Sequence, residues 1–119
     1  IEETIKKQDI VITTALIPGR PAPRLVTAAM VKSMKPGAVI VDMAVEQGGN
    51  CELSEPGKIA YKHDVTIVGY RNIPARIATD ASALYARNLF NLFGLLADKE
   101  SGGLKLNQDD EIIKAIVLT

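Results

Sequence analysis

The chain has 119 residues, and its 14 Lys and Arg side chains balance 14 Asp and Glu side chains, so the formal net charge is zero. This is the length of one ordinary domain, and the balanced charge argues against a nucleic-acid binder, which carries a clustered basic excess. With 47% hydrophobic residues the chain is too apolar to be disordered, yet its apolar runs fall short of the ~20 residues that span a bilayer. A single cysteine, Cys51, and a single histidine, His63, exclude an internal disulfide and argue strongly against a Cys/His zinc site.

The opening residues 1–7 are typical of the middle of a helix, and the first residue is not Met, so we expect a piece of a longer protein. Three short apolar runs then predict strands at residues 9–14, 38–43 and 65–69. Each contains several consecutive apolar or β-branched residues, a pattern typical of strands buried on both faces of a parallel sheet. Roughly twenty residues separate one run from the next, which suits crossover connections and is too long for hairpins. The sequence therefore predicts an α/β fold.

The two connections between the predicted strands differ in character. The first predicts a helix over residues 25–34, because Val26, Met30 and Met34 fall on one helical face. The second connection, residues 46–64, is rich in Gly, Pro and polar residues and shows no helical pattern. We expect it to form an ordered loop across the end of the sheet.

The last third of the chain predicts one long helix and a final strand. Residues 82–98 give the strongest helical pattern, with an apolar arc wide enough to be enclosed between two bodies. Thr79, Asp80 and Ser82 offer side-chain oxygens that could cap its start. Ser101 and two glycines then break the helix, and the β-branched residues 112–118 predict a terminal strand.

Loops that directly follow the predicted strands are the first place to seek a ligand, because ligands bind beyond the carboxyl ends of parallel strands. These loops cover residues 13–19, 42–50 and 69–74. Small residues such as Ala15 and Ala44 would let a planar ligand approach the backbone closely. The alternative is that these segments are the turns that any α/β domain needs, and the pattern alone leaves both interpretations open.

Single polar residues add limited evidence for chemistry. Asn72 offers both a donor and an acceptor, which suits a ligand that carries an amide. Glu46 could act on a substrate or could cap a backbone turn, and both roles stay open. We expect His63 to be a solvated loop residue, Cys51 to be structural, and the acidic residues 109–111 to form a solvated turn.

No Gly-x-Gly-x-x-Gly motif between a strand and a helix occurs in the sequence. If the ligand is a dinucleotide, we therefore expect the half of the site that grips the pyrophosphate to lie upstream of Ile1.

Several longer motifs occur in a fixed order along the chain. They are DIVITTALIPGRPAP at 9–23, MKPGAVIVDMA at 34–44, EQGGNC at 46–51, SEPGK at 54–58 and VGYRNIP at 68–74. Together these motifs resemble the alanine dehydrogenase and proton-translocating nicotinamide nucleotide transhydrogenase superfamily, over roughly residues 8–98. The stretch ARIATDASALYARNL at 75–89 resembles the transhydrogenase branch more closely than the dehydrogenase branch.

The resemblance implies a place within a larger NAD(H)-binding domain I of a transhydrogenase alpha subunit, which is a homodimer of two Rossmann-like subdomains per chain. Residues 1–78 would form the C-terminal half of the NAD-binding subdomain, and residues 79–119 would connect it to the other subdomain, where the terminal strand belongs. NADH bound there passes a hydride directly to NADP⁺ on a partner domain, coupled to proton translocation through a membrane domain. Implied partners are the remainder of its own NAD-binding domain and the NADP(H)-binding and membrane domains. The implied location is cytoplasmic and peripheral to the inner membrane in bacteria, or the matrix side in mitochondria.

The same resemblance implies which residues hold NAD(H), without any catalytic acid or base and without a metal. The cofactor-binding residues that it carries over are Thr14, Ala15, Leu16, Met43, Ala44, Glu46, Asn72 and Ile73. The glycine fingerprint, the ribose-binding acid and the Arg-Gln-Asp loop of the family do not occur in this sequence, so we expect the fragment alone to be inactive. Two alternatives remain. One is an alanine dehydrogenase, in which an aspartate stands at the position of Glu46, and the other is a non-catalytic module that docks other subunits.

Overall fold

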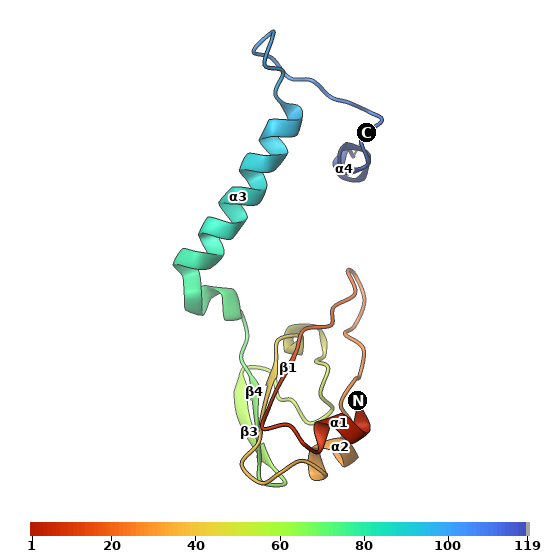
Figure 1. Cartoon of the computed structure of the whole chain (residues 1–119), viewed down its shortest axis with the longest axis vertical. Coiled ribbons are helices and arrows are strands. Elements are labelled where there is room, and N and C mark those ends of the chain that lie inside the picture. Colours follow the sequence, from red (N-terminus) through yellow and green to blue (C-terminus); the bar gives the residue numbers. More distant parts are fainter. Residues whose placement is uncertain (119) are drawn as a thin grey trace. The chain divides into compact units, whose positions relative to one another are not determined.

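The computed structural model describes residues 1–118 and divides into two compact units, Ile1–Arg76 and Ile77–Thr119 (Figure 1). The first unit contains a four-stranded sheet, two short α-helices and a 3-10 turn, and the second contains the long helix. The α/β fold class predicted from the sequence is confirmed.

The sheet is built on three parallel strands, β1 (Ile10–Thr13), β2 (Val39–Asp42) and β4 (Val65–Gly69). These are the strands that the apolar runs predict. The strand order is β1-β2-β4-β3, so that β2 lies between β1 and β4. Because β1, β2 and β4 run in the same direction, their carboxyl ends meet at one edge of the sheet.

A fourth strand, β3 (Lys58–Lys62), pairs antiparallel with β4 where the sequence predicts only a loop. Its residues are exposed except Ala60, so it lacks the apolar run that marks a buried strand. The turn that joins β3 to β4 consists of His63 and Asp64, both with left-handed φ angles of 55° and 61°. Such a two-residue turn suits a tight hairpin, but Asn-Gly is its usual sequence signal. The prediction of a loop over the whole second connection was therefore wrong.

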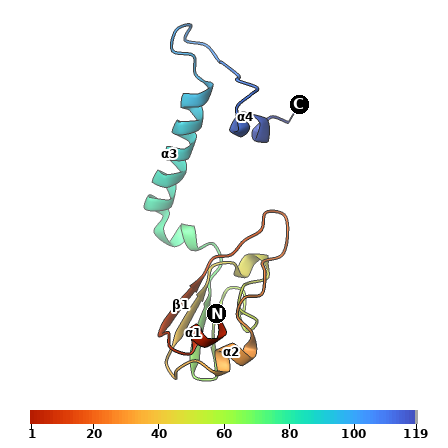
Figure 2. The same ribbon diagram turned by 45° about the vertical axis from the view of Figure 1, so that its right-hand side comes forward.

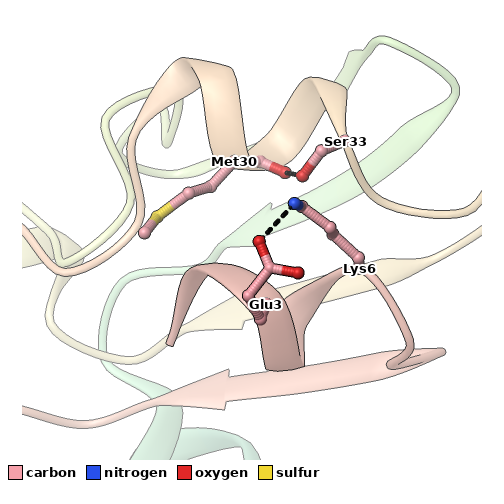
Figure 3. Close-up of polar contacts among 4 residues, drawn as sticks. All are labelled: Glu3, Lys6, Met30 and Ser33. Atoms are coloured by element: carbon pink, nitrogen blue, oxygen red, sulfur yellow. Dashed lines mark hydrogen bonds and ion pairs between the residues drawn. The ribbon is translucent and has the colours of Figure 1, made fainter.

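One face of the sheet is covered by two short helices, α1 (Glu2–Ile5) and α2 (Ala28–Lys32), which lie on the same side of it (Figure 2). Figure 3 shows the two helices beside each other, with the Glu3–Lys6 ion pair of 2.6 Å on α1. The buried residues of this layer form one apolar core: Ile5, Val26, Val31, Met34, Ala38, Ile40, Cys51, Ala60, Val65 and Ile67. The predicted helix at 25–34 is confirmed in its central part, capped by the Thr27 hydroxyl, which accepts the Met30 N–H.

The opposite face of the sheet is apolar and uncovered by the residues that the structure describes. The β1–β2 register places Ile10 beside Val39 and Ile12 beside Val41 on this face. Ile10 is 66% exposed and Ile12 is 63% exposed. An isolated protein rarely leaves such contiguous apolar surface in water, so this face needs a covering partner.

The second unit begins with the long helix α3 (Ala78–Leu96), which follows directly on the 3-10 turn η2 (Ile73–Ile77). The helix starts earlier than predicted, and no side chain caps it, so the proposed caps Thr79, Asp80 and Ser82 lie inside its first turns. Because η2 leads straight into the helix, the chain does not pause in the extended conformation that a capping residue adopts. Apolar side chains on several sides of α3 are exposed, including Leu84, Tyr85, Phe90 and Phe93.

The predicted terminal strand is wrong, because the chain forms helix α4 (Glu111–Ile116) there. The Asp110 carboxylate accepts the N–H groups of Ile112 and Ile113 at 2.8 and 3.3 Å, which makes a helix N-cap. The strands that the structure describes all lie in the first unit, so no neighbour pairs with this segment. A β-branched sequence without a pairing strand follows its cap instead, and the spacing of Ile113 and Ile116 gives one apolar helical face.

Candidate functional site

The loops after β1, β2 and β4 emerge from the same edge of the sheet, as the parallel topology requires (Figure 1). The final residues of β1 and β2, Thr13 and Asp42, are direct partners in the sheet register. The structure therefore brings together the three segments that the sequence singles out.

Asp42 forms the centre of this edge and is fully buried, with 0% of its surface exposed. Its two oxygens accept five hydrogen bonds from the surrounding loops, at 2.7 to 3.2 Å: from the hydroxyls of Thr13 and Ser54 and from the backbone N–H groups of Ala44, Asn50 and Cys51. A carboxylate can be buried only when its charge is compensated in this way. Burial alone would raise the pKa of Asp42, but the hydrogen bonds from Cys51, Ser54, Asn50 and Ala44 outweigh it and hold that pKa below its usual range. The buried side chain is therefore ionised at neutral pH.

Asn50 is the second buried polar residue of the edge, also with 0% exposure. Its side-chain oxygen accepts the Ala15 N–H at 2.9 Å, and its amide nitrogen donates to the carbonyls of Ala15 and Pro23 at 2.9 and 2.8 Å. Its backbone carbonyl accepts the N–H groups of Leu25 and Val26 at 2.9 and 3.0 Å. The loop after β1 is thus bonded at both of its ends to the loop after β2.

The loop after β4 is joined to the same edge through Glu46. The Glu46 Oε2 atom accepts the backbone N–H of Asn72 at 3.1 Å, and Asn72 adopts a left-handed φ of 48°. The Arg76 guanidinium stacks over the Tyr70 ring at 3.6 Å from its centroid, which fixes both ends of this short segment. Of the two roles that the sequence left open for Glu46, the structure shows the backbone cap.

The eight sequence-predicted residues lie in these joined loops but differ in exposure. Leu16 is 49% exposed and Met43 is 42% exposed, so both offer apolar surface at the edge. Thr14, Glu46 and Asn72 are exposed, and Ala15 and Ile73 are half-buried. Ala44 is buried, and its N–H is bonded to Asp42, so it supports its loop from within and offers no surface of its own.

The residues that organise the edge, Asp42 and Asn50, were not singled out by sequence reasoning. The available signal was an aspartate at the end of an apolar strand, followed at a short distance by an asparagine between small residues. Polar side chains in such apolar surroundings are buried only with full hydrogen bonding, and the partners that reveal this are far apart in sequence.

The remaining polar candidates lie away from chemistry. Cys51 is fully buried, and burial raises the pKa of its thiol, in keeping with the predicted structural role. His63 lies in the β3–β4 turn, at the end of the sheet opposite to the three loops. Within residues 1–118, no group of His, Cys, Asp and Glu side chains is arranged to hold a metal ion. The edge is therefore built to bind and orient a ligand, without a recognisable acid–base pair.

Comparison with known proteins assigns relatives to this chain. The model of the family described as "Alanine dehydrogenase/PNT, C-terminal domain" matches residues 1–119. The chain is 56% identical over 113 residues to the first of the separately encoded parts of NAD(P) transhydrogenase subunit alpha of Rhodospirillum rubrum, covering 95% of the chain and 29% of that relative. It is 39% identical over 103 residues to alanine dehydrogenase of Mycolicibacterium smegmatis, covering 83% of the chain and 28% of that enzyme. The crystal structure of transhydrogenase from Sinorhizobium meliloti aligns with a TM-score of 0.71 and 62% identity, over 77% of this chain and 28% of the other.

The chain thus spans less than a third of the length of these relatives. Among the helices of residues 1–118, none has both the length and the apolar character that a membrane crossing requires.

Proposed function

Because the chain belongs to the alanine dehydrogenase/PNT C-terminal domain family, we propose that it forms part of the NAD(H)-binding component of a nicotinamide nucleotide transhydrogenase. In this role it positions NADH for direct hydride transfer to NADP⁺ on a partner domain, coupled to proton translocation by the intact complex. The observation that carries the proposal is the bonding of three loops into one edge, through Ala15–Asn50 and Glu46–Asn72. A ligand beyond the carboxyl ends of the strands would meet all three loops at once.

The exposed residues of the edge fit a nicotinamide nucleotide. Leu16 and Met43 present apolar surface to a planar ring, and the half-buried Ala15 permits close approach. The exposed Asn72 side chain offers a donor and an acceptor to a carboxamide. When bound, NADH supplies the hydride, and the chain's own residues would hold the ring in place and keep water away from it. This division of labour agrees with an edge that carries no acid–base pair.

Two observations favour the transhydrogenase over the alanine dehydrogenase. The identity is 56% to the former relative and 39% to the latter. In addition, the Glu46 carboxylate, at the position where the dehydrogenase branch has an aspartate, is bonded to the Asn72 backbone. A carboxylate that caps a loop is restrained from reaching a substrate.

We further propose that the partners are the remainder of its own NAD-binding domain, a second subunit in a homodimer, and NADP(H)-binding and membrane domains that it meets at the membrane periphery. Residues 1–78 would complete the NAD-binding subdomain, and residues 79–119 would lead to the other subdomain. The uncovered apolar face around Ile10 and Ile12 and the exposed apolar side chains of α3 support this proposal. The relatives supply the missing length, because this chain spans only 29% of the transhydrogenase relative.

The proposal is tested by titrating NADH, followed by its fluorescence, into the full-length subunit that contains this chain, here termed the parent subunit. Asn72→Gly removes the side-chain amide without backbone strain, because Asn72 has a left-handed φ of 48° that glycine adopts freely. We expect the Kd for NADH to rise roughly 3- to 10-fold, the value of one lost hydrogen bond. Ala15→Val should also weaken binding, while the matched control Ala29→Val on the exposed face of α2 should not. Unchanged affinity in both site variants would show that the carried-over positions are wrong.

A further inference from the structure

We propose that Asp42 and Asn50 are the positioning residues of the nucleotide edge: they set the geometry of the loops after β1 and β2 without touching the ligand. This inference rests on the proposed function, since it takes those loops to be the ones that hold NAD(H). Both side chains are completely buried, so they act on a ligand only through the backbone that they hold.

The Asn50 amide holds the loop after β1 in a way that few side chains could reproduce. It pairs with both the N–H and the carbonyl of Ala15 and donates a further bond to Pro23. One side chain therefore closes the two ends of the segment between residues 15 and 23, which contains Leu16. Aspartate at this position would lose both donated bonds, and glutamine would be too long by a methylene.

The Asp42 carboxylate holds the loop after β2 in turn. It accepts the N–H groups of Ala44 and Asn50, which lie on either side of the turn that contains Glu46. The bond from the Asn50 N–H links the carboxylate to the residue that anchors the other loop. The Ser54 hydroxyl, at 2.7 Å, is the shortest of its five contacts and lies outside both nucleotide loops.

The network is separate from the apolar core that stabilises the sheet. Its members Thr13, Asp42 and Asn50 lie at or beyond the carboxyl ends of the strands, whereas Ile40 and Ile67 are buried at the centre of the sheet. Loss of a bond in the network should therefore disorder the loops more than the sheet. This separation allows positioning to be distinguished from general stability.

The test uses the parent subunit with Asn50→Ala and with the pair Ser54→Ala and Ser54→Thr. Ile67→Ala serves as the control, because it destabilises the core without touching the network. NADH affinity is measured by fluorescence, KM and kcat by hydride exchange with the NADP(H)-binding partner, and loop order by hydrogen exchange of a peptide covering residues 14–24. Thermal unfolding reports the loss of stability in each variant.

We expect Asn50→Ala to raise the Kd and the KM for NADH by about tenfold or more, with kcat changed less than about twofold, because ground state and transition state lose the same binding. Hydrogen exchange in residues 14–24 should accelerate in the same variant. Ser54→Ala should weaken NADH binding severalfold and Ser54→Thr, which keeps the hydroxyl, should restore it. Ile67→Ala should leave the Kd unchanged at an equal loss of stability.

The inference is overturned if Ile67→Ala weakens NADH binding as much as Asn50→Ala at the same unfolding temperature, or if folded Asn50→Ala binds NADH normally. Should Asn50→Ala fail to fold, the Ser54 pair decides, and equal affinity of the alanine and threonine variants overturns it. A wild-type parent subunit that binds no NADH would refute the proposed function instead. Faster exchange of the loop in Asn50→Ala would then still show that Asn50 holds it.

Discussion

Gly49→Ala should destabilise the edge because Gly49 lies against the Asp42 carboxylate. Gly49 has a φ of +80°, and a Cβ added there would lie 2.6 Å from Asp42 Oδ2. The neighbouring Gly48 has a φ of +97° with no atom within 4 Å of an added Cβ. The two alanine variants therefore share the backbone strain, and only one of them also meets the carboxylate.

The expected magnitudes follow from these two contributions. A left-handed backbone costs an L-residue roughly 1–2 kcal/mol, and this applies to both variants. Overpacking adds about 1–3 kcal/mol at Gly49 alone, since the five hydrogen bonds that hold the Asp42 carboxylate prevent it from moving aside. Gly49→Ala should therefore be destabilised by roughly 2–5 kcal/mol and Gly48→Ala by roughly 1–2 kcal/mol.

Native-state hydrogen exchange of the Cys51 amide in the parent subunit measures this difference, because that N–H donates directly to Asp42. The amide should exchange about 5- to 150-fold faster in Gly49→Ala than in Gly48→Ala, which corresponds to the expected difference of about 1–3 kcal/mol. Equal exchange rates in the two variants would refute the reasoning, since they would show that the carboxylate yields without cost.

Three further predictions concern residues around the sheet. Because the pKa of Asp42 is lowered in the folded state, its ionised form stabilises the fold above the unfolded pKa of about 3.9, and this stabilisation is lost as the pH falls through the folded pKa. The difference in unfolding free energy between wild type and Asp42→Asn, measured by urea titration, should therefore shrink below about pH 4, and a constant difference would contradict it. The buried Cys51 thiol, whose pKa burial raises, should react with iodoacetamide only at the rate of unfolding, and mass spectrometry that finds label on the native subunit would contradict this. Replacing the left-handed His63 and Asp64 by Asn-Gly should raise the unfolding free energy by about 1 kcal/mol with NADH affinity unchanged, and unaltered thermal unfolding would show that the turn is not strained.

The fold could be predicted from the sequence where a local pattern carried enough information. The apolar runs identified β1, β2 and β4, because strands buried within a parallel sheet need continuous apolar residues. The exposed strand β3 has no such pattern, and its existence depends on pairing with β4. Helix α4 likewise depends on the Asp110 cap and on the lack of a pairing strand in its unit, which outweigh the β-propensity of its isoleucines.

The position of the candidate site could be predicted, but its construction could not. Parallel strands place their following loops at one edge, so topology alone brought residues such as Ala15 and Asn72 to the same place. The bonds from Asn50 to Ala15 cross 35 positions of sequence. No local pattern reports a contact of that kind, because it depends on the folded path of both loops.

The most direct test of the account mixes the parent subunit with the NADP(H)-binding partner of a transhydrogenase and follows hydride transfer from NADH to an NADP⁺ analogue by absorbance. The account predicts direct transfer by the wild-type protein, with a higher KM for NADH in Asn72→Gly. It would be contradicted by an absence of transfer together with NADH-dependent amination of pyruvate by the same subunit.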